Sequence, residues 1–326
     1  MEVLSWNKEG LFKRPMKRFS KIYFLRYLLL CFGISIIIFS CNGPNQRTDT
    51  DSPKSGKINI SVDESFKPVI DSQIQVFEAL FPGTKINAAY KPEADCLKDL
   101  AKDSTRMIII TRGLNPEEEK FYKDLLKYGP TWDKVANDAV SLIVNNDSKD
   151  TVITMTKLKG ILDGSTADKE IAVFDGLSAT STVRYAIDSI LKGKPFDSKK
   201  VFAAKNSIDV INYVAANKNA IGFVGVSWIG NKEDTSQLSF LKKVKIVSVE
   251  CRACEGKPFV KPFQANIMLK RYPLVRGLYY ILKENYDGLG SGFANFLEYE
   301  KGQLIFSRAY LGPAKMNFSV RSASLN

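Results

Sequence analysis

Short runs of β-branched residues alternate with amphipathic segments through most of the chain, and this alternation constrains the fold more than any other feature. The segments "KINISV" and "RMIIIT" have the composition of strands, whereas apolar side chains recur at helical spacing between them. Parallel strands need a crossover connection, usually a helix, so the alternation predicts an α/β fold. The first predicted strands are 57–62, 84–90 and 106–111, and the first predicted helices are 66–82, 94–103 and 115–129.

The same alternation continues in the second half of the chain. Segment 272–283 is apolar and rich in aromatic residues; it fits a strand or a helix, and we interpret it as core and hinge packing. Trp132 and Trp228 are either core residues or part of a cleft, since tryptophan is usually buried. A body of about 270 residues fits one α/β domain or two lobes. The later strands are predicted at 139–145, 170–174, 200–204 and 220–226, and the later helices at 155–164, 182–192, 207–218 and 290–312.

A basic segment followed by an apolar run opens the chain. Residues 22–40 are apolar, and five basic side chains lie in the nine residues before them. This is the layout of a secretory signal, so we predict that residues 1–40 are a signal peptide and that Cys41 is lipidated, as in bacterial lipoproteins. The alternative is an uncleaved membrane anchor, although Arg26 interrupts the run. Translation starts at Met1 or Met16.

Residues 41–56 are polar, which predicts a flexible tether between the lipid and the folded body. Loss of residues 1–40 removes seven basic and two acidic side chains, so the formal charge falls from +12 to +7. A basic surplus favours an anionic ligand or surface. The lysines are scattered, however, and no nucleic-acid-binding module is recognisable. The predicted location is the cell envelope, on a membrane facing the periplasm.

The chain contains no histidine, and this excludes Ser-His-Asp and Cys-His catalysis as well as histidine-containing zinc sites. We therefore predict a binding protein rather than an enzyme, with no cofactor and no metal. Cys251 and Cys254 are spaced for a short disulfide in an exported protein; free thiols or a redox pair are the alternatives.

Four hydroxyl side chains gather between the predicted strand 170–174 and the helix that follows it. They are Ser178, Thr180, Ser181 and Thr182, and Arg184 lies one turn inside the helix. A helix N-terminus at the carboxyl end of a strand favours oxyanions, because its amides are unpaired and its dipole is positive there. The alternative is a polar loop in which a single Ser or Thr caps the helix.

Two other strand-to-helix junctions have similar chemistry. Ser65 and the Phe66 amide follow strand 57–62, and Thr111 and Arg112 follow strand 106–111. A tetrahedral oxyanion needs donors from several directions, so three such junctions together predict an anion site. Arg112 either contributes charge to that site or lies on the surface.

The order of these pieces resembles the phosphate-binding component of bacterial phosphate ABC importers, a periplasmic-binding-protein family. The resemblance spans residues 57–315. It is carried by "DESFKP", "IIITRGL", "ANDAVSLIVNND", "MTKLKGILDG", "TSTVRYAIDSIL", "NAIGFVGVSWI", "YPLVRGLYYIL" and "GSGFANFLEYEKGQLIFSRAYLGPA".

The resemblance implies a two-lobed, type II binding-protein fold, each lobe a mixed sheet flanked by helices. Lobe 1 would combine residues 57–138 with 283–326, lobe 2 would be 143–272, and two crossing hinge strands would lie near 139–142 and 273–282. Phosphate or a similar oxyanion would bind between the lobes of a monomer and pass to an ABC permease. The implied ligand groups are Ser65, the Phe66 amide, Thr111, Thr180, Ser181 and Thr182.

The chain departs from the family pattern at two charged positions. Asp175 and Gly176 stand where the family has an arginine, and Arg106 stands close to where it has an aspartate. The cation would then come from Arg112 or Arg184, and a ligand proton would be accepted by Asp175, Asp63 or Glu64. The alternative is that the site binds another oxyanion or none, in a scaffold or signalling protein.

Overall fold

The computed structural model describes residues 51–316 except 168, 177 and 232. These residues belong to one compact unit, Asp49–Asn326. The predicted signal peptide 1–40 and the lipidation site Cys41 lie outside the described residues. Within the described part, none of the helices has both the length and the apolar character needed to cross a bilayer.

Strands and helices alternate along the chain, as the sequence predicts. The strands are β1 (Gly56–Asp63), β2 (Thr84–Lys91), β3 (Met107–Ile110), β4 (Thr131–Asn145), β5 (Val152–Ile153), β6 (Ile171–Phe174), β7 (Val201–Ala203), β8 (Ala220–Gly225), β9 (Val244–Ile246), β10 (Ser248–Glu250), β11 (Phe259–Val260), β12 (Val275–Leu282) and β13 (Gly312–Pro313). The helices are α2 (Lys67–Leu80), α3 (Glu93–Leu100), α4 (Pro116–Leu126), α5 (Met155–Asp163), α6 (Ser181–Tyr185), α7 (Ser207–Ala216), α8 (Thr235–Leu241), α9 (Gln264–Met268), α10 (Leu289–Glu298) and α11 (Glu300–Arg308).

The main sheet runs in the order β2-β1-β3-β12-β4-β8-β6-β7. In its first half, β1 is parallel to β2 and β3, and β12 is antiparallel to β3. In its second half, β6 is parallel to β7 and β8, and β8 is antiparallel to β4. Each half is therefore a mixed sheet, and the carboxyl ends of β1, β3 and β6 lead into the three predicted junctions.

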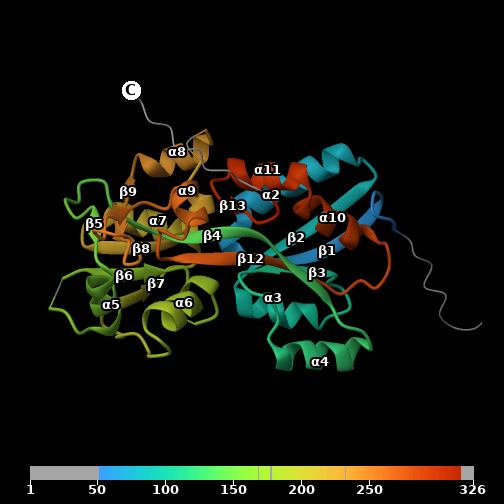
Figure 1. The fold of residues 1–326 in the computed structure, drawn as a ribbon, viewed down its shortest axis with the longest axis horizontal. Coiled ribbons are helices and arrows are strands. Elements are labelled where there is room, and N and C mark those ends of the chain that lie inside the picture. Colours follow the sequence, from blue (N-terminus) through green and yellow to red (C-terminus); the bar gives the residue numbers. More distant parts are fainter. Residues whose placement is uncertain (1–50, 168, 177, 232, 317–326) are drawn as a thin grey trace, which may run out of the picture. The chain divides into compact units, whose positions relative to one another are not determined.

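Strands β4 and β12 run side by side through the middle of the sheet and join its two halves (Figure 1). The first part of β4, up to Ala139, pairs with β12, and the part from Val140 onward pairs with β8 and β9. Strand β4 begins at Thr131, earlier than the predicted 139, and segment 272–283 contains a strand rather than a helix. The exact lobe and hinge boundaries stay a prediction.

Apolar side chains from both halves form the core. Phe77 of α2 packs edge-on against Phe293 and Phe296 of α10, beside the first half of the sheet. Val210 and Val214 of α7 pack against β8 and β4 in the second half. Burial of apolar surface is the main term that stabilises a fold, so the packing of these helices holds both halves of the sheet in place. The loops of the three junctions leave from the carboxyl ends of strands in these two halves.

Three sequence predictions need correction. The predicted helix 290–312 is two helices, because Tyr299 adopts an extended conformation between α10 and α11. The predicted helix 182–192 is α6 followed by a π-helical turn, Ala186–Ile190. The tether ends earlier than residue 56, since Asp51 pairs with Arg106 at 2.9 Å and Gly56 begins β1.

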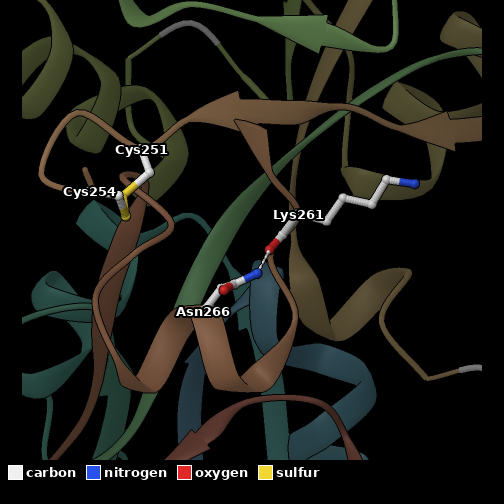
Figure 2. Close-up of a disulfide and its surroundings, with 4 residues drawn as sticks. All are labelled: Cys251, Cys254, Lys261 and Asn266. Atoms are coloured by element: carbon white, nitrogen blue, oxygen red, sulfur yellow. Dashed lines mark hydrogen bonds between the residues drawn. A yellow bond between two sulfur atoms is a disulfide. The ribbon is translucent and has the colours of Figure 1, made fainter. Parts of the chain in front are cut away.

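Cys251 and Cys254 form a disulfide with a Cα–Cα distance of 5.4 Å (Figure 2). It closes the turn after β10, where the Cys251 amide donates to the Pro258 carbonyl. Farther along the chain, beyond β11, Asn266 Nδ2 of α9 donates to the Lys261 carbonyl at 2.9 Å. The disulfide therefore shapes a turn in the second half of the chain and contributes no group to the three junctions.

Candidate functional site

The first junction is a tight turn between β1 and α2. Asp63 ends β1 and its Oδ1 accepts from the Ser65 amide at 2.9 Å, which starts a 3₁₀ turn, Glu64–Phe66. Ser65 and Phe66 are fully buried. The Ser65 carbonyl accepts from Ser227 Oγ at 2.8 Å, so this turn is held from the other half of the sheet.

The hydroxyls of the third junction have four different surroundings. Thr180 caps α6, since its Oγ1 accepts from the Val183 amide. Thr182 donates to the Asp175 carboxylate, and Ser178 is exposed. Ser181 is fully buried, and its Oγ lies 3.4 Å from Ser65 Oγ. Two of the predicted junctions therefore meet through one pair of serines.

Arg276 of β12 lies against this serine pair. Its Nη1 donates to Ser181 Oγ at 2.8 Å, and its Nε donates to Asp138 Oδ2 of β4 at 2.8 Å. The side chains of Arg276 and Asp138 are 2% and 0% exposed. The guanidinium carbon also lies 5.1 Å from the centre of the Phe66 ring. The buried cation is thus Arg276, whereas the sequence suggested Arg112 or Arg184.

Neither Arg276 nor Asp138 is among the site residues predicted from the sequence. Both lie in apolar strands, and the apolar, aromatic-rich surroundings of Arg276 indicate core and hinge packing. A signal did exist, because a charged residue inside an apolar strand is rarely buried without a partner of opposite charge. The one arginine in "YPLVRGLYYIL" and the one aspartate in "ANDAVSLIV" form such a pair.

The second junction lies close to the third but has its own partners. Glu93 of α3 accepts from the Thr111 amide and from its hydroxyl. Arg184 Nη2 donates to Thr111 Oγ1 at 2.6 Å, and Arg184 Nε donates to Glu93 Oε2 at 2.6 Å. Arg112 makes two hydrogen bonds to Glu118, of 2.6 and 2.8 Å, at the start of α4. Thr111 and Arg112 are therefore held by carboxylates of the protein.

Carboxylates outnumber cations in the buried part of the site. Asp63, Asp138 and Asp175 are buried around Arg276. Burial, opposed by the charge of Arg276, raises the pKa of Asp63 to about 6. Burial, opposed by the hydrogen bond from Ser207, raises the pKa of Glu64 to about 7. These two carboxyl groups can therefore carry or exchange a proton near neutral pH.

Three buried polar atoms of this cluster have no hydrogen-bond partner among the described residues: Asp63 Oδ2, Asp138 Oδ1 and Arg276 Nη2. Leaving a buried polar atom unpaired costs about 1–3 kcal/mol, so such atoms call for an explanation such as a ligand. Gly225 allows the close packing here, since a Cβ at that position would lie 3.1 Å from the Ser65 carbonyl oxygen and 3.3 Å from Arg276 Nη2.

A cavity of about 360 Å³ lies beside this cluster. Asp63, Glu64, Asp175 and Thr180 line one part of it. The arrangement thus combines buried hydroxyls, a buried guanidinium and protonatable carboxyls next to a cavity. Such a set can hold a small oxyanion that carries a proton.

Comparisons with known proteins agree with this geometry. The family model of the PBP superfamily domain matches residues 47–299. A protein from Clostridium perfringens, assigned as a phosphate ABC transporter substrate-binding protein and solved with bound phosphate, aligns with a TM-score of 0.65 and 20% identity over 80% of this chain and 100% of that chain.

Two further solved structures share the fold. An ABC-type phosphate transport receptor from Vibrio cholerae aligns with a TM-score of 0.58 and 19% identity, over 79% of this chain and 100% of that chain. PstS from Borrelia burgdorferi aligns with a TM-score of 0.50 and 18% identity, over 79% and 99%. A comparison with curated proteins finds no significant match. The predicted α/β binding-protein fold is confirmed, and the chain belongs to the PBP superfamily.

Proposed function

We propose that this protein is the lipid-anchored, extracytoplasmic solute-binding component of an ABC importer and captures phosphate or a similar oxyanion. The observation that carries the proposal is the meeting of Ser65 and Ser181. They come from junctions 116 residues apart in the chain, yet their hydroxyls lie 3.4 Å from each other and next to Arg276. Separate loops that converge in this way can surround a small anion.

The direction of the hydrogen bonds supports an anionic ligand. Ser181 Oγ accepts from Arg276, so its own proton points to another acceptor. In this structure its neighbours are Ser65 Oγ and the Asp63 carboxyl group, and a bound anion would take their place. Arg276 Nη2 is a further buried donor without a partner among the described residues. Hydroxyls and one paired guanidinium stabilise an oxyanion through directed donors, with little net positive charge.

The carboxylates support a ligand that carries a proton. Asp63 and Asp175 would repel a fully ionised oxyanion such as sulfate, but each can accept a hydrogen bond from the P–OH of hydrogen phosphate. We therefore expect phosphate to bind more tightly than sulfate.

Contacts around the site also support closure of one half of the sheet on the other. Besides the Ser65–Ser181 and Ser65–Ser227 contacts, the Ala94 amide donates to the Ala179 carbonyl at 3.1 Å, and Ser207 Oγ donates to Glu64 at 2.8 Å. Each bond joins a residue that precedes β4 to one that follows it. A hinge motion in β4 and β12 would break all of them together and release the solute.

Isothermal titration calorimetry on the chain from Asp49 onward tests this function. We expect saturable binding of phosphate and weaker binding of sulfate. Ser181→Ala should abolish or strongly weaken phosphate binding, whereas Ser72→Ala, in an exposed turn of α2, should leave it unchanged. Absence of binding for phosphate and all other oxyanions would favour the scaffold or signalling alternative.

A further inference from the structure

A carboxylate of the protein fills the second junction. Glu93, the first residue of α3, is 2% exposed. Its Oε1 accepts from the Thr111 amide at 3.0 Å and from the Thr111 hydroxyl, and its Oε2 accepts from Arg184 Nε at 2.6 Å. Arg184 Nη2 also donates to Glu93 Oε1 at 3.4 Å, so the guanidinium contacts both oxygens. A backbone amide, a hydroxyl and a guanidinium are the donors with which proteins bind oxyanion ligands.

These donors come from both halves of the sheet. Glu93 and Thr111 precede β4, which joins the halves, whereas Arg184 lies in α6 and follows it. Immediately after Glu93, the Ala94 amide donates to the Ala179 carbonyl at 3.1 Å. The first turn of α3 is therefore tied to the other half by an ion pair and by a backbone hydrogen bond.

Glu93 is bound in its anionic form. Burial raises the pKa of its carboxyl group, but the hydrogen bonds from Arg184 and Thr111 outweigh this effect, so the pKa is lowered and the group is ionised at neutral pH. Arg184 also pairs with Asp188 at 3.3 Å, but Asp188 is exposed and belongs to the same half as Arg184. Because a buried charge is costly to leave unpaired, the ion pair between Glu93 and Arg184 opposes separation of the halves.

We propose that Glu93 is an internal anion, whose carboxylate fills an oxyanion site between Thr111 and Arg184 and holds the two halves together in the absence of solute. The inference goes beyond the function proposed above and does not depend on it, because Ser65, Ser181 and Arg276 take no part in this contact. Without the Glu93 carboxylate, a free carboxylate ion should enter the vacated site, and the halves should separate more readily.

Acetate rescue of Glu93→Ala tests whether the carboxylate fills an anion site. The substitution removes a CH₂ group and a carboxylate, which together correspond in size and charge to acetate. In the chain from Asp49 onward, the melting temperature of Glu93→Ala should rise saturably in acetate relative to chloride at equal ionic strength, by about 2–4 °C. The unsubstituted chain should show no such rise, because Glu93 already occupies the site.

Two variants are matched controls for the rescue. Glu93→Gln keeps a group of the same shape in the site, so acetate should not stabilise it. Asp188→Ala removes the exposed carboxylate that pairs with the same arginine, and acetate should not stabilise this variant either, because it leaves no enclosed site.

Small-angle X-ray scattering of the solute-free protein tests whether the internal anion holds the halves together. The radius of gyration of Glu93→Ala should exceed that of the unsubstituted chain, and acetate should reduce it again. Arg184→Met removes the partner in the other half from a partly exposed position, so this variant should fold. It should also have a larger radius of gyration, which acetate should not reduce.

Each measurement can overturn the proposal. If acetate raises the melting temperature of Glu93→Ala no more than that of Asp188→Ala, the Glu93 carboxylate does not fill an anion site. If Glu93→Ala is unfolded in chloride, recovery of its circular dichroism spectrum in acetate becomes the readout, and no recovery has the same meaning. If Arg184→Met keeps the radius of gyration of the unsubstituted chain, the ion pair does not hold the halves together. None of these measurements uses phosphate, so their outcome is independent of the importer function.

Discussion

Thr111 and Ser181 follow the same local pattern, a hydroxyl residue after a buried strand, yet their surroundings differ. The Thr111 hydroxyl donates to Glu93 and accepts from Arg184, so the protein uses both of its hydrogen-bonding directions. The Ser181 hydroxyl accepts from Arg276, and it lies next to Ser65 Oγ at 3.4 Å and the Asp63 carboxyl group, whose pKa is raised to about 6 mainly by burial. We therefore propose that the Ser181 hydroxyl, beside a carboxyl group that can be protonated, is a ligand group. The Thr111 hydroxyl is instead held by Glu93, whose pKa is lowered, against the effect of burial, by the hydrogen bonds from Arg184 and Thr111.

The two arginines at these places differ in the same way. Arg184 is about one third exposed and pairs with Glu93, whereas Arg276 is buried and pairs with Asp138. A buried pair is costly to break, because the remaining charge has no water around it. The four predictions below test this difference, from the largest expected effect to the smallest.

Arg276→Met should lower the free energy of unfolding by about 3–5 kcal/mol, because Asp138 would remain as an unpaired buried charge. Urea denaturation measures the change. The double variant Arg276→Met with Asp138→Leu should recover much of the loss. Equal destabilisation of the single and double variants would mean that packing, and not charge, is responsible.

Asp63→Asn should remove a pH dependence of stability. Because the folded state raises the pKa of Asp63 from 3.8 to about 6, ionisation costs folding free energy, and stability falls as the pH rises through this window. A shift of this size corresponds to about 3 kcal/mol. Thermal or urea unfolding at pH 4 and pH 7 should show a smaller decline in Asp63→Asn.

Asp71→Asn is the matched control for this pH experiment. Asp71 is about half exposed and pairs with Lys67 one turn away on α2, outside the buried cluster. Its substitution should leave the difference in stability between pH 4 and pH 7 as in the unsubstituted chain. If Asp63→Asn shows the same difference in stability as this control, ionisation of Asp63 is not the cause of the decline in stability between pH 4 and pH 7.

Ser181→Ala should weaken phosphate binding more than Thr111→Ala does. Loss of the Ser181 hydroxyl removes the donor that we propose for the anion and should weaken binding about tenfold or more, since a hydrogen bond to a charged group contributes about 1.5–3 kcal/mol. Loss of the Thr111 hydroxyl should weaken binding less than about threefold, through altered positions of Glu93 and Arg184. Equal losses in calorimetry would contradict the distinction between the two junctions.

Arg112→Met should have the smallest effect. Its ion pair with Glu118 is partly exposed, and such pairs contribute about 0–1 kcal/mol to stability. Phosphate affinity should stay within about twofold of the unsubstituted chain. A tenfold loss of affinity would instead show that Arg112 reaches the anion in the bound state.

Much of the fold could be predicted because its signals are local. β-branched runs and helical spacing identify β1, β3, β6 and β8 within short windows of sequence. The boundaries of segments, such as the end of the tether, are harder to predict where contacts between distant residues determine them. Asp51 belongs to the folded body because Arg106 pairs with it and the Leu289 amide donates to it, and both residues are far away in the sequence.

The site was predictable only in part, for a similar reason. Helix starts after strands suggested Ser65 and Ser181, but nothing local distinguishes them from Thr111 or Ser178. The difference depends on Arg276, Asp138 and Glu93, which reach the site through strand pairing and helix packing. Such long-range pairing cannot be inferred from periodicity.

Arg276 and Asp138 face each other in register across the two strands that join the halves of the sheet. A rotation of one half about these strands would carry both charges along as neighbours. Opening would then separate Ser181 from Ser65 without leaving either buried charge unpaired. The protein could therefore release a bound solute while Arg276 stays paired with Asp138.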